Sequence, residues 1–190
     1  MNTATHNFSL VADLEQGRVA VRARDGQEYR LRPIRPSDAA SLARGYAAMS
    51  AEAKHNRMLH KVPELTPAMA ALYCAPDPER DYVVIVEGRD ALVGEVLGGA
   101  RLTGLKDGKA AQISVSLRPE GEHKGLGKAA LKTVLRVAQE KGMQSVWGIV
   151  VTDNRPMMAL ARSLGFTFAE NPDDPSETLI RLDLKGKSFA

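Results

Sequence analysis

The sequence predicts a single α/β domain in which a mixed sheet carries helices on both faces. The expected elements run from a strand hairpin through several helices to a meander of three strands, and then alternate between strand and helix. The chain has 190 residues, of which 44% are hydrophobic. This length and composition suit one domain with one sizeable core.

Composition excludes several classes of protein. Charged residues make up 26% of the chain, and no apolar run approaches the ~18 residues of a membrane span. The first ten residues lack a secretory signal, and the single Cys74 with four histidines favours neither a disulfide nor a zinc site. A formal charge of +3, spread along the chain, does not indicate nucleic-acid binding. We therefore expect a cytoplasmic protein with no metal, membrane or nucleic-acid partner.

A strand hairpin is the first expected element. Residues 18–24 and 27–34 alternate between polar and apolar side chains, and Asp25-Gly26 between them is a favoured two-residue turn. Residues 1–16 are expected to be a partly ordered lead-in.

Three helices are expected next, each from a local start signal. Ser37 is the predicted N-cap of the first, Ser50 begins a second that runs to about His60, and Thr66-Pro67 begins the third. The apolar face of the third helix is expected to combine Met69, Leu72 and Tyr73.

The centre of the sheet is expected to be a meander of three strands. Residues 82–86 form a continuous apolar run, which is typical of a buried strand. Residues 91–102 form a long strand whose glycines suggest a bulge, and residues 110–117 form the next strand after a turn at Asp107-Gly108. The polar side chains of this last strand share one face: Gln112, Ser114 and Ser116.

The remaining elements alternate between helix and strand. Residues 125–141 form the clearest helix, with an apolar stripe opposite a basic one and Gly142 as its stop signal. A strand at 145–151 and a helix at 154–164 follow, before closing strands at 166–169 and 178–184. The basic stripe consists of Lys124, Lys128, Lys132 and Arg136.

The loop from Glu122 to Lys128 carries the first chemical signal. It lies between a strand and the clearest helix, and Gly125 and Gly127 let its backbone turn tightly beside a ligand. The first amide N–H groups of a helix point outward at its positive end, so this geometry favours a pyrophosphate. An ordinary flexible turn is the alternative. The spacing excludes a Walker loop and a dinucleotide fingerprint.

The second signal is the segment 154–166, which begins with Asn154 and ends in Leu-Gly-Phe. Together the two segments resemble the GNAT N-acetyltransferase superfamily. The resemblance implies the GNAT acyl-CoA N-acyltransferase fold, whose central sheet is mixed and mostly antiparallel, and acetyl-CoA as the acyl donor. The cofactor-binding residues that it implies are Val115, Ser116, Leu117, Glu122, His123, Lys124, Gly125, Leu126, Gly127, Lys128 and Asn154.

A narrower resemblance covers about residues 27–170. Residues 29–38, together with 49–60 and 64–67, are similar to the acetyltransferase domain of bacterial Pat-type protein lysine acetyltransferases. The resemblance implies direct attack of a primary amine on acetyl-CoA in a ternary complex. A protein lysine or N-terminus is the favoured acceptor, a small-molecule amine is close behind, and a homodimer is left open.

Several positions depart from the family pattern. Glu122 replaces the usual Gln or Arg, and His123 replaces the usual Gly. Gln112 stands where Pat-like domains carry a glutamate as general base, and Ala161 stands where the superfamily carries a tyrosine as general acid. An amine of pKa near ~10.4 must lose a proton before it attacks, and glutamine cannot accept one.

The catalytic expectation therefore rests on Gln112 and Glu95. Glu95 is expected on the strand at 91–102, where it would act as the base through a water molecule. His55 and His60 are alternatives in the helical segment beside the cleft. An acyl-CoA-binding sensor without meaningful turnover is the second functional hypothesis.

Three regions are expected along the chain. Residues 1–26 form the lead-in and the first strand of the hairpin, residues 27–184 form the acetyltransferase domain, and residues 185–190 form a tail.

Overall fold

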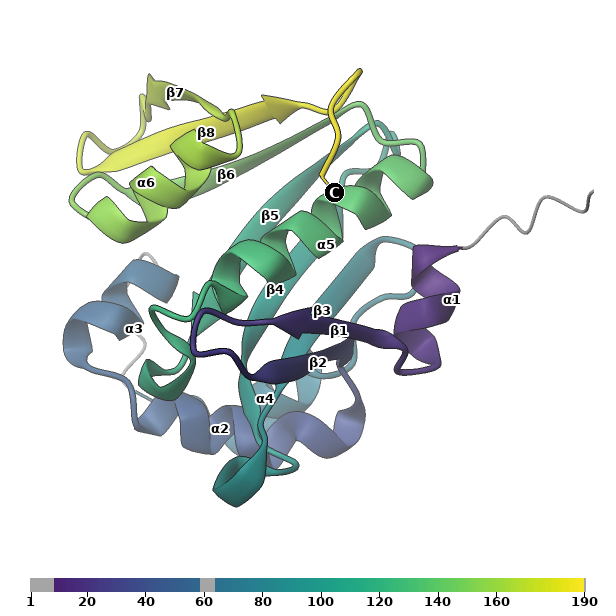
Figure 1. Cartoon of the computed structure of the whole chain (residues 1–190). Helices are drawn as coiled ribbons and strands as arrows, with labels where there is room; N and C mark the ends of the chain where they lie inside the picture. Colours follow the sequence, from purple (N-terminus) through teal and green to yellow (C-terminus); the bar gives the residue numbers. More distant parts are fainter. Residues whose placement is uncertain (1–8, 59–63, 190) are drawn as a thin grey trace, which may run out of the picture.

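The structure, a computed structural model, describes residues 9–58 and 64–189 and contains one eight-stranded sheet (Figure 1). The strand order is β1-β2-β3-β4-β5-β6-β8-β7, and only β5 and β6 are parallel among the paired neighbours. The predicted fold class, a mixed and mostly antiparallel sheet with helices on both faces, is confirmed. The strands are β1 (Val19–Arg22), β2 (Glu28–Pro33), β3 (Asp81–Glu87), β4 (Val96–Gly104), β5 (Ala110–Leu117), β6 (Ser145–Val151), β7 (Thr167–Glu170) and β8 (Glu177–Asp183).

Helices cover both faces of the sheet (Figure 1). One face carries α5 and α1, and the other carries α2 and α4, which pack against each other beside β4. None of the helices in residues 9–58 and 64–189 is long and apolar enough to cross a bilayer. The helices are α1 (Leu10–Glu15), α2 (Ala39–Ala47), α3 (Ala51–Met58), α4 (Pro67–Tyr73), α5 (Leu126–Glu140) and α6 (Arg155–Ser163).

The helix α5 builds the main core. Its apolar stripe, which includes Leu126, Leu131 and Leu135, is fully buried against the sheet. Burying a leucine side chain stabilises the fold by about 1.5–3 kcal/mol, so this stripe anchors α5 across β3, β4 and β5. Gly142, at a φ of 76°, ends the helix as predicted.

The hairpin of β1 and β2 forms as predicted, but the lead-in contains a helix that the sequence analysis missed. The helix α1 is capped by Ser9, whose Oγ accepts a hydrogen bond from the amide of Ala12 over 3.4 Å. Leu10 and Leu14 of α1 are buried in the main core. A helix of six residues depends on such packing, so local sequence signals it weakly.

Two predictions for the helices on the other face are wrong. Ser37 does not cap α2, because residues 36–38 form a 3₁₀ turn and the carboxylate of Asp38 accepts the amide N–H of Arg35 over 2.7 Å. Leu72 is 75% exposed, and the buried residue of α4 is Ala70. The N-cap of α4 is Thr66, as predicted. His60, the expected end of the second helix, lies outside the described residues.

The strand β4 is shorter than expected, which changes the position of Glu95. A 3₁₀ turn occupies residues 90–92, and β4 begins only at Val96. The predicted bulge is present, because Val86 pairs with Gly98 while Glu87 pairs with Val96. The expectation that Glu95 lies on this strand is therefore wrong.

Candidate functional site

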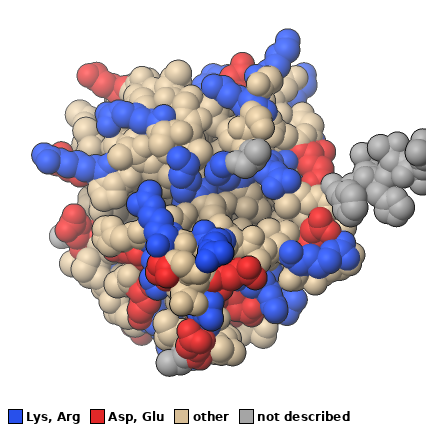
Figure 2. Space-filling model, viewed as in Figure 1, with Lys and Arg blue, Asp and Glu red and all other residues tan. Residues whose placement is uncertain are grey.

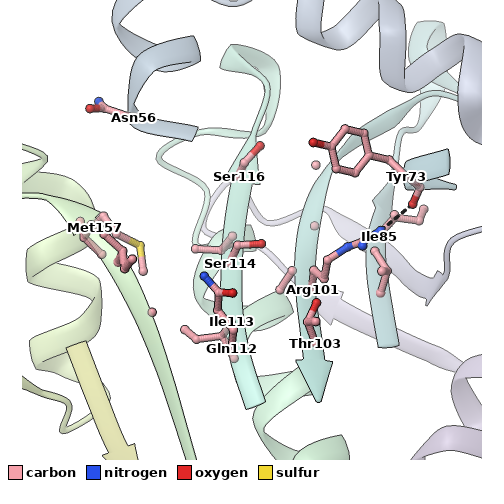
Figure 3. Close-up of a pocket in the computed structure, with 18 of the residues that line it drawn as sticks. Asn56, Tyr73, Ile85, Arg101, Thr103, Gln112, Ile113, Ser114, Ser116 and Met157 are labelled. Carbon is pink, nitrogen blue, oxygen red and sulfur yellow. Dashed lines mark hydrogen bonds between the residues drawn. The ribbon is translucent and has the colours of Figure 1, made fainter. Parts of the chain in front are cut away.

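The described residues enclose a cavity of about 430 Å³ on the face of the sheet opposite α5. It extends across β3, β4, β5 and β6, and its rim includes side chains of the helices α2, α3, α4 and α6 (Figure 3). The polar face predicted for β5 lines it, with Gln112, Ser114 and Ser116 on the same side of the strand. The alternation of that strand therefore correctly predicted that these three side chains share one face.

The cavity opens where β5 and β6 separate. These two parallel strands pair only between residues 110–112 and residues 145–147, although both continue for several residues beyond. Past this point β5 keeps its partner β4 on one side, and on the other side none of the described strands pairs with it, which leaves an open edge. Backbone N–H and C=O groups on such an edge are available to a ligand that lies along it. Val115 and Ser116, two of the predicted cofactor residues, line the cavity here.

The loop before α5 has the geometry of an anion site. His123 and Gly125 adopt left-handed conformations with φ of 58° and 83°, and Gly125 occupies the N-cap without a capping side chain. An α-helix leaves its first amide N–H groups without an intrahelical acceptor, at the positive end of its dipole. This site therefore suits a phosphate group.

The close packing of Leu117 on Gly127 positions this loop. A Cβ atom placed on Gly127 would lie 3.3 Å from Cδ1 of Leu117, so the glycine lets α5 start close to the end of β5. The side chain of Leu117 is partly buried against the main core and does not line the cavity. Leu117, one of the predicted cofactor residues, therefore supports the loop by packing against Gly127.

Lys124 is directed towards the hairpin. Its Nζ donates to the hydroxyl of Tyr29 over 2.9 Å and lies 3.3 Å from Oδ2 of Asp25. The hydrogen bond with Tyr29, reinforced by Asp25, holds the pKa of Lys124 above its usual value. The neighbouring side chains of Glu122 and His123 are 44% and 93% exposed.

Basic side chains lie along α5 beyond the loop, while Asp25, Glu120 and Glu122 lie close to the loop itself. Figure 2 shows Lys and Arg side chains gathered on the face that carries α5 in Figure 1. Lys128, Lys132 and Arg136 of α5 belong to the basic stripe predicted from the sequence, and none of the three is buried. A positive surface beside a helix N-terminus favours a ligand that carries phosphates.

Asn154 lies at the rim of the cavity and caps α6. Its Oδ1 accepts the amide N–H of Met157 over 3.1 Å, and both residues line the cavity. The predicted helix start is confirmed. The cap fixes the start of α6 at the rim of the cavity.

The other end of the cavity, over β3 and β4, contains residues that the sequence analysis did not identify. Arg101 and Thr103 come from β4, and Tyr73 comes from the end of α4 (Figure 3). Among the described residues that line the cavity, Arg101 is the one charged side chain, and there is no carboxylate or imidazole. Alternation along β4 was the available signal, because Arg101 and Thr103 interrupt an otherwise apolar and glycine-rich strand.

Glu95 lies outside the lining of the cavity. Its carboxylate accepts hydrogen bonds from Ser41, Arg44 and Arg118, with 2.9 Å to Oγ of Ser41 and 3.1 Å to Nη1 of Arg118. The hydrogen bond from Arg44, together with those from Ser41 and Arg118, lowers the pKa of Glu95 below 4.5. His55 is exposed and does not line the cavity.

Comparisons with known proteins agree on one family. The sequence profile of the family described as acetyltransferase (GNAT) domain matches residues 29–167. An acetyltransferase of Pseudomonas aeruginosa is 25% identical over 162 residues, which span 84% of this chain and 86% of that protein.

Solved structures share the fold. The GNAT domain of PAT from S. lividans superposes with a TM-score of 0.77 at 21% identity, over 87% of this chain and 96% of that one. YncA from Salmonella typhimurium, a putative acetyltransferase solved with its cofactor acetyl-CoA, gives a TM-score of 0.66 at 20% identity, over 85% and 97% of the two chains.

Proposed function

Because the chain belongs to the GNAT acetyltransferase family, we propose that it uses acetyl-CoA as its acyl donor and transfers the acetyl group to a primary amine. The match covers residues 29–167, which include the cavity-lining strands and the loop before α5. The observation that carries the proposal is the combination of this loop with the adjoining open edge of β5.

The donor would lie between the separated strands. Its pyrophosphate would bind the backbone N–H groups of residues 123–128, while its extended arm follows the edge of β5 at Val115 and Ser116. Asn154 would support this position by capping α6. The backbone makes most of these contacts, which is why Glu122 and His123 are compatible with binding. Lys124 would contribute positive charge near the loop, although its ammonium is engaged by Tyr29 and Asp25.

The acceptor would enter from the end of the cavity over β3 and β4. Its nitrogen attacks the thioester carbonyl carbon, the carbon–sulfur bond breaks, and an amide and the CoA thiol are formed. Gln112 lies between the two ends of the cavity, so that its amide can orient the attacking nitrogen. Because glutamine cannot accept a proton, the amine would enter the reaction after losing its proton to solvent.

Glu95 is a weaker candidate for the base than its position in the sequence suggested. A carboxylate with three hydrogen-bond donors and a lowered pKa has little tendency to take a proton from an amine. We propose that Glu95 positions Arg118, which leads into the loop. The catalytic role of Glu95 remains a prediction that mutagenesis can decide.

The test measures both steps on the purified protein. Calorimetry with CoA should give a saturable affinity, and release of the CoA thiol from acetyl-CoA should depend on an added amine. The panel includes a lysine peptide, a peptide with a free N-terminus and small amines, because the proposal covers protein and small-molecule acceptors. The proposal fails if CoA does not bind, or if CoA binds and no amine stimulates thiol release at pH 9.

A sensor without meaningful turnover is the second candidate function. It is favoured by one observation, the lack of a carboxylate or imidazole among the described residues of the cavity lining. Binding of CoA without amine-dependent thiol release would select this alternative.

A further inference from the structure

We infer that Arg101 binds an anionic group of the acceptor, so that the acceptor is a small amine carrying a carboxylate or a phosphate-like group. This inference rests on the proposed acetyl transfer and names the substrate class for the same site. It starts from the one charged side chain among the described residues of the cavity lining.

Arg101 occupies the acceptor end of the cavity. On β4 it pairs with Val83 of β3 on one side and Ser114 of β5 on the other. Its side chain is 26% exposed, so the guanidinium is largely removed from bulk solvent and still reaches the cavity surface. An acceptor that enters beside Gln112 and Ser114 would therefore lie next to the side chain of Arg101.

Two protein oxygens hold the guanidinium in place. Nη2 donates to the backbone carbonyl of Tyr73 over 2.7 Å, and Nη1 lies 3.3 Å from Oδ2 of Asp81. Figure 3 shows the side chain leaning away from Gln112 towards Tyr73. A guanidinium has five N–H donors, so these two acceptors leave capacity for a ligand.

The surroundings of Arg101 favour an anionic ligand. Asp81 offsets part of its charge through one hydrogen bond of 3.3 Å and does not itself line the cavity. The centroid of the Tyr73 ring lies 5.6 Å from Cζ of Arg101, and the apolar Val83, which pairs with Arg101 in the sheet, also lines the cavity here. In such surroundings a charge interacts more strongly than in water. The planar guanidinium also matches the geometry of carboxylate and phosphate oxygens.

The same charge discriminates among amines. A protonated amine without an anionic group brings a second positive charge into a cavity whose charged side chain is already positive, and like charges within a few ångströms repel. An acceptor that carries its own anionic group enters with its charges balanced. Once it is bound, the guanidinium also favours the neutral form of the amine, which is the nucleophilic form.

The distance between the two groups limits the size of the acceptor. Neighbouring strands lie about 4.8 Å apart, so Arg101 is one strand spacing from β5, beside which the thioester would lie. Because the guanidinium leans away from β5, the chain that joins the amine to the anionic group must span more than one strand spacing. Amino acids with a few methylene groups between the two ends meet this requirement.

The experiment compares matched acceptors on the full chain. Thiol release from acetyl-CoA is measured with glycine, β-alanine and 4-aminobutanoate as carboxylates, 3-aminopropylphosphonate as the phosphate-like probe, and butylamine as the neutral match. The variants are Arg101→Gln and Arg101→Lys. The control is Arg80→Gln, which removes an exposed cation whose guanidinium donates to the carbonyl of Gly104 outside the cavity lining.

We expect at least one anionic acceptor to exceed butylamine by tenfold or more in kcat/KM. This ratio should fall towards one in Arg101→Gln, retain part of its value in Arg101→Lys, and stay unchanged in Arg80→Gln. Circular dichroism and CoA affinity verify that the variants are folded. The relative rates of the carboxylates and the phosphonate identify which anion the site takes.

Two results would overturn the inference while leaving the proposed function intact. The first is equal use of anionic amines and butylamine by the unmodified protein, and the second is a preference that survives in Arg101→Gln. If no amine of the panel, lysine peptides included, stimulates thiol release while CoA binds, the proposed function itself fails and this inference with it.

Discussion

The guanidinium of Arg118 donates to the carboxylate of Glu95 over 3.1 Å, which joins the residue before β4 to the residue after β5. Ser41 and Arg44 of α2 donate to the same carboxylate. Because Arg118 leads through a short 3₁₀ turn into the loop before α5, this cluster connects α2 to the proposed pyrophosphate site.

The first prediction concerns Glu95→Gln. If Glu95 positions Arg118, the variant should bind CoA several-fold more weakly, and the shape of its pH–rate profile should match that of the unmodified protein. A base at Glu95 would instead lower turnover at least tenfold while CoA affinity stays constant. Calorimetry and the pH dependence of kcat/KM separate the two roles, and Glu95→Asp should restore CoA binding in part only if positioning is the cause.

Replacing Gln112 with glutamate should accelerate the reaction. The unmodified protein should show a rate that rises with pH, because the free amine must come from solution. General-base catalysis is typically worth ~10²–10⁴-fold, so Gln112→Glu should raise kcat/KM at pH 7 by at least tenfold and flatten the pH profile. Gln112→Ala is the control, which should show no gain. An unchanged rate in Gln112→Glu, with CoA binding intact, would contradict the inference that the lack of a base at this position limits the rate.

Gly127 tests the pyrophosphate site. Gly127→Asp places a negative charge at the start of α5, where the phosphates are proposed to bind, and should weaken CoA binding at least tenfold. Gly127→Ala is the matched control: its Cβ would lie 3.3 Å from Cδ1 of Leu117 and 3.9 Å from Cγ2 of Val115, both methyl groups of side chains, and alanine in a helix is ~0.5–1 kcal/mol more favourable than glycine. Titration calorimetry compares the two. Equal affinities in the aspartate and alanine variants would exclude this site.

The stability of α2 should depend on Asp38. Its carboxylate accepts two hydrogen bonds from Arg32, at 2.8 and 2.9 Å, and both side chains are buried. Breaking a buried ion pair by removing one partner typically costs about 3–5 kcal/mol, and Glu87 at 3.1 Å from Arg32 should keep the loss towards the lower end. Urea denaturation measures the loss in Asp38→Asn. Asp13→Asn breaks a more exposed pair with Arg18 and should cost less than about 1 kcal/mol.

The stabilisation of the fold by the carboxylate of Asp38 should decrease as the pH falls. Burial raises the pKa of Asp38, but hydrogen bonds from Arg32 and the amide of Arg35 outweigh it and hold the pKa below 3.8. The folded state therefore binds this proton less readily than the unfolded chain. The stabilisation is present above about pH 4 and is lost as the pH falls through the folded pKa. This acid-sensitive component should be absent in Asp38→Asn.

Elements with local signals could be predicted from the amino-acid sequence. The apolar stripe of residues 125–141 gave α5, the alternation of residues 110–117 gave β5 with its polar face, and Asn154 marked the start of α6. The glycines of the loop before α5 predicted its tight turn, because a positive φ at Gly125 and an uncapped helix start are properties of the local backbone, and the anion site proposed there stays a prediction.

Tertiary structure alone decided which side chains meet in the cavity. Glu95 was expected on a strand, yet a 3₁₀ turn and the bulge opposite Val86 place it in a cluster with Arg44 and Arg118. Arg101 is held at the cavity because its side chain contacts the end of α4 and the start of β3, which lie 28 and 20 residues away in sequence. Register and contacts between distant segments arise from packing of the whole core, which periodicity along a single strand does not encode.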